Sequence, residues 1–179
     1  MKRVPWVTDA ERASLGDVDW TVTVTEPLPD CPSVEAGWQR IATQTTWGKW
    51  RSESKMRGKD VTTTIVPPAK EPLQAGDEYI VKVGRLMSIR CRVLETSDPG
   101  TGTGEDGGMV FDAMGVTLGG IVNARFRFTV FRGEDGLIMA RAQEKMMSLP
   151  LLTPSKKTLE SEHRHTFRDL NDSFRSAAR

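Results

Sequence analysis

The last part of the chain, from Thr153 to Ala178, contains no glycine and a single proline close to its start. Thr153 and Pro154 are typical of a helix start, because threonine is a good N-cap and proline is tolerated at the first helical position. At ~1.5 Å per residue the predicted helix would be roughly 35 Å long, enough to cross a small domain. Such a helix is only marginally stable by itself in water. It therefore needs an apolar surface on which to lie.

One face of this predicted helix is apolar. Five residues fall within an arc of about 80° on a helical wheel, namely Leu159, His163, Phe167, Leu170 and Phe174. The opposite face carries the charged residues Lys156, Glu160, Arg164, Arg168 and Asp172. A helix with this distribution is expected to bury its apolar face against the rest of the domain.

Before this helix, the chain alternates apolar and polar residues over several short segments. The alternation predicts one strand, two short helices and then about six consecutive strands. The strands are expected at Asp19–Thr25, Arg51–Val66, Glu78–Val83, Met87–Val93, Met109–Val116, Ile121–Phe131 and Leu137–Met147, and the helices at Ser33–Thr43 and Thr45–Lys49. Consecutive strands joined by tight turns imply an antiparallel sheet with helices on one face. The predicted fold class is α+β, with a curved antiparallel sheet wrapped around the long C-terminal helix.

Several local sequences are typical of one superfamily. They are Trp38 in the first helix, Trp47-Gly48-Lys49-Trp50, Gln74-Ala75-Gly76-Asp77-Glu78-Tyr79, Val93-Leu94-Glu95-Thr96-Ser97-Asp98-Pro99, Phe126 to Phe131, and Gly133-Glu134-Asp135-Gly136. With the order of the elements, they make residues 19–179 resemble the START-like, or Bet v 1-like, helix-grip superfamily. This superfamily is also called SRPBCC (polyketide cyclase/dehydrase and lipid-transport proteins). Residues 1–18 fall outside the pattern and are expected to form an N-terminal extension.

The resemblance implies a deep apolar pocket under the C-terminal helix, used for lipids, sterols, polyketides or other hydrophobic molecules. It does not imply one reaction, because the fold is shared by carriers, aromatase/cyclases and chaperone activators. The leading interpretation is that the protein binds or carries a hydrophobic or aromatic small molecule in an internal cavity. One alternative is a cofactor-free enzyme of the polyketide aromatase/cyclase type. Another is a chaperone-activator-like interaction module, which would show an exposed apolar patch.

Charge and cysteine content narrow the expected partners. The 25 basic and 24 acidic side chains give a formal net charge of +1, which favours neither nucleic acid nor an anionic membrane. Arg125 and Arg127 are spaced as the outward, solvated face of a strand. Cys31 and Cys91 fit reduced thiols in a cytoplasmic protein better than a disulfide. Neither a signal peptide nor a membrane-spanning run is found in the sequence. The oligomeric state stays open.

Neither a cofactor nor a metal is expected. Residues 102–107, Gly-Thr-Gly-Glu-Asp-Gly, match the GxGxxG dinucleotide pattern, but a strand is expected to follow where the pattern needs a helix. Glu105 and Asp106 would also repel phosphate, so a flexible hairpin loop is the better interpretation. A zinc site needs three or four converging ligands, whereas the two histidines, His163 and His165, fall on nearly opposite helix faces.

His163 is the unusual residue of the apolar face. It is either a core histidine satisfied by one neighbouring group, or an acid–base group that contacts a ligand. Glu144 is its natural partner if the alternation of the last strand turns this side chain inward; alternatively, Glu144 lies near the strand end and is solvated. His163 and Glu144 are therefore the candidate catalytic residues. On the ligand interpretation, His163→Phe is expected to change stability by no more than about 1 kcal/mol.

The predicted ligand-binding residues are mostly apolar and are expected to face inward from the sheet and the helix. They are His163, Phe167, Phe126, Phe128, Ala142, Val81, Ile89 and Trp50. The small side chain of Ala142 leaves room beneath the helix. Trp50 either closes one end of the pocket or serves as a structural anchor. A mostly apolar lining with a few polar groups is what small-molecule sites in proteins have in common.

Overall fold

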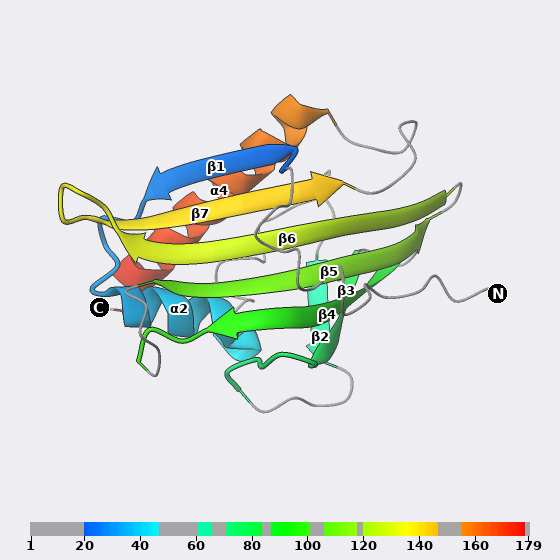
Figure 1. Ribbon diagram of the computed structural model, residues 1–179, viewed down its shortest axis with the longest axis horizontal. Coiled ribbons are helices and arrows are strands. Elements are labelled where there is room, and N and C mark those ends of the chain that lie inside the picture. The colour runs from blue at the N-terminus through cyan, green and yellow to red at the C-terminus, as the bar shows by residue number, and fades with distance from the viewer. Residues whose placement is uncertain are drawn as a thin grey trace.

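The computed structural model describes residues 20–46, 61–65, 71–83, 87–100, 106–117, 120–146 and 155–177 of the chain. Within these ranges a seven-stranded antiparallel sheet carries its helices on one face (Figure 1). The elements are β1 (Val22–Pro27), α2 (Val34–Ala42), the 3₁₀ turn η2 (Gln44–Thr46), β2 (Val61–Ile65), β3 (Glu78–Val83), β4 (Met87–Ser97), β5 (Gly107–Thr117), β6 (Gly120–Arg132), β7 (Ile138–Met146) and α4 (Lys156–Ala177).

The strand order in the sheet is β1-β7-β6-β5-β4-β3-β2. Strands β2 to β7 follow one another as a meander, and β1 joins the far edge by pairing with β7. Figure 1 shows α4 crossing behind β1, β7 and β6, with α2 behind the ends of β5 and β6. The α+β helix-grip prediction, a curved antiparallel sheet around a long C-terminal helix, is confirmed. Each predicted strand recurs in the described residues, and β3 has the predicted ends. Of the strand expected at Arg51–Val66 the described part is β2, and residues 51–60 and 66 lie outside the described residues.

In the described part of the chain, the α-helices α2 and α4 both begin at serine caps. In α2, Ser33 Oγ accepts a hydrogen bond from Ala36 N at 3.1 Å, as expected for a helix starting there. In α4, Ser155 Oγ accepts from Thr158 N at 3.1 Å, so the helix begins at Lys156 and the prediction of Thr153 as the N-cap is wrong. The sequence offers hydroxyl side chains at both 153 and 155, and spacing alone does not choose between them. Of the second predicted short helix, the described part is η2, and residues 47–50 lie outside the described residues.

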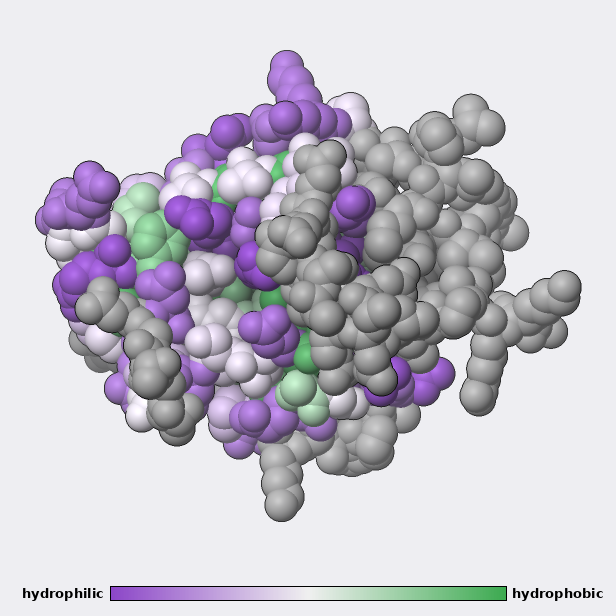
Figure 2. Space-filling model, viewed as in Figure 1, coloured by the Kyte–Doolittle hydropathy of each residue, from purple (hydrophilic) through white to green (hydrophobic). Residues whose placement is uncertain are grey.

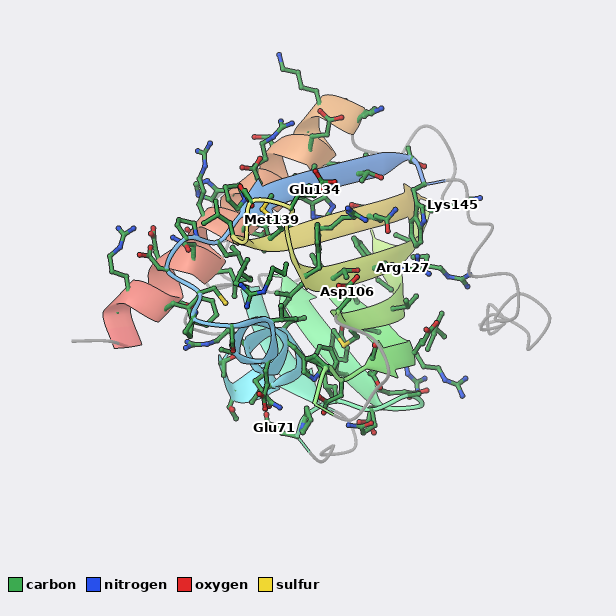
Figure 3. The ribbon with its side chains drawn as sticks, turned by 60° about the vertical axis from the view of Figure 1, so that its left-hand side comes forward. Glu71, Asp106, Arg127, Glu134, Met139 and Lys145 are labelled. Atoms are coloured by element: carbon green, nitrogen blue, oxygen red, sulfur yellow. The ribbon has the colours of Figure 1, made fainter. Side chains whose placement is uncertain are left out.

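Helix α2 packs closely on the sheet because a glycine lies at each of two close approaches. A Cβ placed on Gly107, the first residue of β5, would come within 2.7 Å of Trp38 Cβ, and one on Gly37 would come within 2.8 Å of Val130 Cγ1. No real Cβ fits at these distances, so both glycines are needed for this approach. Figure 3 shows Glu71 below α2. There its carboxylate accepts hydrogen bonds from Thr45 N at 2.9 Å and Thr45 Oγ1 at 3.0 Å, which fixes the turn after the helix.

The core lies between the inner face of the sheet and the apolar face of α4. All five residues predicted for that face are buried: Leu159, His163, Phe167, Leu170 and Phe174. They meet an inner sheet face that includes Val22, Val24, Phe128, Val130, Ala140 and Ala142. At ~1.5 Å per residue the 22-residue helix is about 33 Å long and spans this face.

The outer face of the sheet is less exposed than the sequence suggests. Arg127 and Lys145, labelled in Figure 3, extend from β6 and β7 away from α4. Arg125, expected on a solvated face, is only 6% exposed, so that expectation is wrong for this residue. Alternation along a strand determines which face a side chain takes but not what lies over that face. Hydrophobic residues show in small, separate areas of this face in Figure 2.

A polar cluster ties the loop after β1 to the end of α4. Asp30 Oδ2 accepts hydrogen bonds from Asn171 Nδ2 at 2.6 Å and from Arg175 at 2.7 Å, and Asp30 N donates to Asn171 Oδ1 at 2.9 Å. The hydrogen bond from Arg175 is the main cause that holds the pKa of the Asp30 carboxyl below its usual value. The charge on Asp30 therefore favours the folded chain.

Replacement of Phe167 by alanine should lower the free energy of unfolding by about 3–5 kcal/mol, because the ring is 1% exposed and its removal leaves a cavity. Chemical denaturation measures this loss. Phe131→Ala is the matched control: that ring is half-buried on the outer face beneath Arg141 and should cost about 1 kcal/mol. A loss below about 1 kcal/mol for Phe167→Ala would mean that α4 does not hold the core together.

Asp30→Asn should make the protein less stable at pH 7, with a deficit that disappears in acid. A depressed folded-state pKa contributes stability above the unfolded value of about 3.9, and this contribution is lost as pH falls through the folded-state pKa. Thermal unfolding of both proteins from pH 7 to pH 2 measures the gap. Glu134→Gln, in the exposed β6–β7 turn, should not change the profile. A gap that stays constant with pH contradicts the role of the Asp30 charge.

Candidate functional site

A buried acid–base pair lies between the sheet and α4. His163 Nε2, in α4, and Glu144 Oε2, in β7, are 2.8 Å apart, within hydrogen-bonding distance. The side chains are 9% and 4% exposed, respectively. The structure thus brings together the two residues that were predicted as candidate catalytic groups.

The inward direction of Glu144 follows from the alternation of β7. Ile138, Ala140, Ala142 and Glu144 are buried, whereas the residues between them are more exposed. In the ladder, Glu144 lies between Val22 of β1 and Phe126 of β6. The alternative that Glu144 is solvated near the strand end is therefore wrong. It fails because β1 pairs with β7 as far as Glu144 and covers its edge.

Aromatic rings surround the histidine. The His163 ring meets Phe126 and Phe128 edge-on, with centroid separations of 6.3 and 6.1 Å. Phe128 in turn meets Phe167 edge-on at 6.2 Å. Edge-to-face contacts at these separations are favourable. The pair is therefore held in apolar surroundings, where its electrostatic interaction is stronger than in water.

The predicted ligand-binding residues are not all gathered at this pair. His163, Phe126, Phe128 and Phe167 form the contacts just described, and Ala142 is fully buried next to Phe128 in the ladder. Ile89 is buried in β4, which β5 separates from β6, so it lies on the same inner face but further away. For Val81 only the backbone in β3 is described, and Trp50 lies outside the described residues.

Trp38 carries a polar indole N–H group. In the sequence, this residue served only as a marker of the fold. Its side chain is fully buried, and among the described residues its Nε1 has no hydrogen-bond acceptor. A tryptophan on the apolar face of a helix is expected to be a core residue. No signal in the sequence shows whether its N–H has a hydrogen-bond acceptor. Within the same residues, no three His, Cys, Asp or Glu side chains converge as a metal ion would require. Cys31 and Cys91 are both free and buried.

Comparison with solved structures finds the same fold in proteins of low sequence identity. The protein jhp0584 from Helicobacter pylori is 11% identical, with a TM-score of 0.67 and 96% of each chain covered. Ginseng major latex-like protein 151 from Panax ginseng is 11% identical, with a TM-score of 0.59 over 84% of this chain and 94% of its own. DynU16, from the dynemicin biosynthetic locus, is 13% identical, with a TM-score of 0.58 over 89% of this chain and 48% of its own.

These neighbours define the class by fold. The chain has the helix-grip fold that the local sequence motifs led us to expect. No protein-family model matches the sequence, and no curated protein sequence matches it. Identities this low show a shared fold and leave the chemistry to be argued from the site.

His163→Phe should lower the free energy of unfolding by about 3–5 kcal/mol, because it leaves the buried Glu144 carboxylate without its partner. This replaces the expectation from sequence of a change within about 1 kcal/mol, which did not include a buried carboxylate. The double variant His163→Phe/Glu144→Leu should regain most of that loss, because no buried charge remains. His165→Phe, on the exposed face, is the control and should change stability by less than about 0.5 kcal/mol. Denaturant titration of all three variants separates the effects, and equal losses in the single and double variants would contradict a coupled pair.

Proposed function

We propose that the protein binds a hydrophobic or aromatic small molecule between α4 and the inner face of the sheet. The observation that carries the proposal is the buried His163–Glu144 pair among the rings of Phe126, Phe128 and Phe167. A buried polar pair is costly to a core and is not needed for stability, since well-packed apolar residues usually serve as well. A small number of polar groups in an apolar lining is, by contrast, what a ligand site requires.

The placement of α4 supports this location. The helix runs close along β1, whereas its contact with the middle strands is made through long side chains. Opposite these side chains the sheet presents small residues, Ala140 and Ala142, which are fully buried. A flat aromatic molecule suits a lining that is rich in aromatic and small apolar side chains. The resemblance to the START-like superfamily also implies a hydrophobic ligand.

A second candidate function is a cofactor-free cyclase, and the acid–base pair is what favours it. An aldol ring closure takes a proton from a methylene carbon between two carbonyls and gives one to the carbonyl oxygen that is attacked. A His–Glu pair that shares a proton can give one and take one back, so that it ends unchanged. DynU16, among the structural neighbours, comes from a biosynthetic locus.

The interaction-module alternative is less well supported. It would require an exposed apolar patch. Among the described residues, the large hydrophobic side chain that is exposed is Leu137, at 44%, in the β6–β7 turn. A single exposed leucine is ordinary for a protein surface. No helix in the described part of the chain is both long and apolar enough to cross a membrane.

Native mass spectrometry of protein purified without denaturation tests the proposal directly. The expected result is a species heavier by one small molecule, which is lost when the protein is unfolded. Recovery of the bare mass alone, even after incubation with a pool of aromatic compounds, would count against ligand binding.

Ala142→Leu tests where the molecule binds. If ligand space lies beneath α4, the larger side chain should change stability by less than about 1.5 kcal/mol and abolish the heavier species. Ala42→Leu, at an equally buried position in α2, is the matched control. It should cost about 1–3 kcal/mol by overpacking and still retain the ligand. An overpacking cost at Ala142 as large as at Ala42, with ligand retained, would place the binding site elsewhere.

A further inference from the structure

Three buried residues lie on the outer face of the sheet, which α2 and α4 do not cover. Leu94 and Val110 are each 4% exposed and form a hydrophobic cluster separate from the main core, and Arg125 is 6% exposed. We call these three residues the outer patch. Other side chains of the same face, such as Thr129 and Phe131 in β6, are only half-buried. A sheet face that is open to water leaves its side chains partly exposed, so the burial of the outer patch requires a local cover.

The outer patch surrounds Arg127 of β6. Val110 of β5 lies opposite Arg127 in the ladder, so the two side chains share a face of the sheet. Figure 3 shows Arg127 extending away from α4, which makes this the outer face. Leu94 clusters with Val110 from the neighbouring strand β4, and Arg125 lies two residues from Arg127 on the same side of β6.

The chain that precedes β1 enters the fold from this outer side. The guanidinium carbon of Arg127 lies 5.3 Å from the centre of the Trp20 ring, a cation–π contact. If the strand continued, Trp20 would face the same side as Val22, which is buried in the core beneath α4. The chain instead bends at Thr21, and Trp20 takes the outer side. Residues 1–18 therefore approach the described fold beside the outer patch.

The other connections in the chain are poorer candidates for this cover. Residues 101–105, between β4 and β5, are Thr, Gly, Thr, Gly and Glu, and offer no large apolar side chain. The β3–β4 and β5–β6 turns lie at the opposite ends of their strands from Leu94 and Val110. The connections to β2 and α4 lead to the far edge of the sheet and to its inner face.

Residues 1–18 have the side chains that such a cover requires. Their larger apolar residues are Val4, Trp6, Val7, Leu15 and Val18. Residues 9–18 have an excess of acidic side chains, Asp9, Glu11 and Asp17 against Arg12. The outward positions of β6 and β7 carry basic residues and no acidic one, the basic residues being Arg125, Arg127, Arg141 and Lys145. At roughly 3.3 Å per residue the segment can reach about 60 Å, enough to cross the sheet.

We propose that residues 1–18 lie across the outer face of the sheet as a tethered cover of the outer patch. Their apolar side chains pack on Leu94 and Val110, and their acidic side chains face the basic residues of β6 and β7. This surface is on the opposite side of the sheet from the proposed ligand site and does not depend on it. Release of the segment would expose an apolar patch with a basic surround, which is the kind of surface that binds another protein.

Thiol reactivity tests the cover. Val110→Cys is prepared in the full chain and in a chain that lacks residues 1–18, and peptide mass spectrometry follows the reaction of each cysteine with iodoacetamide. The thiol at position 110 should react at least about tenfold faster in the shortened chain, because access of the reagent limits the rate. Thr25→Cys, at an exposed position on the outer side of β1, is the matched control and should react equally fast in both chains.

The two native cysteines report whether the shortened chain is folded. Cys31 and Cys91 are buried in the core and should stay unreacted in both chains. Equal rates at position 110, with both native thiols protected, would overturn the proposal. If the native thiols react in the shortened chain, truncation has opened the core, and a measurement on the full chain decides.

Photo-crosslinking is that measurement. In the full chain, p-benzoylphenylalanine replaces Trp6, and crosslinked peptides are identified by mass spectrometry. The expected crosslinks join position 6 to β4, β5 or β6 of the same chain, close to the outer patch. The same replacement at Leu137, exposed in the β6–β7 turn, is the control and should not reach Leu94 or Val110. Any other pattern from position 6 overturns the proposal, and crosslinks between two copies would make a second copy the cover.

Discussion

The apolar face of α4 is the constraint on which the other elements depend. A helix of 22 residues cannot leave Phe167 and Leu170 in water, and the inner face of a seven-stranded sheet is the surface that buries them. Strand β1, at the start of the described fold, pairs with β7 and lies against α4, at the end of the fold. The two ends of the fold therefore close together, and Asp30 joins Arg175 at this closure.

Burial of this helix face also places two ionisable side chains in the core. The helix face that must be buried includes His163, and the strand face that it meets includes Glu144. Two ionisable groups are thus taken out of water together, and neither is satisfied without the other. A chain selected for stability alone would do as well with leucine at both positions. This is the physical reason for regarding the pair as functional, and it depends on no relative of the protein.

Fold and function are related loosely in this molecule. Structures of proteins from Helicobacter pylori and Panax ginseng share the architecture at 11% identity, so very different side chains support the same sheet and helix. Within such a fold, the set of residues that face the helix from β6 and β7 determines which ligand can be held. In this protein that set combines phenylalanine, alanine and one carboxylate, which suits a flat ligand with a single polar atom.

The sequence by itself determined the long helix, the buried face of that helix and the run of antiparallel strands, because periodicity and turn residues act locally. It also placed Glu144 on the same strand face as Ala142. It could not determine that Ser155 caps α4, that Arg125 is covered, or that Glu144 is sealed from water and lies 2.8 Å from His163. Tertiary structure decided these points, because each depends on which distant segment covers a given residue. Burial by a distant segment leaves no periodic signal in the chain.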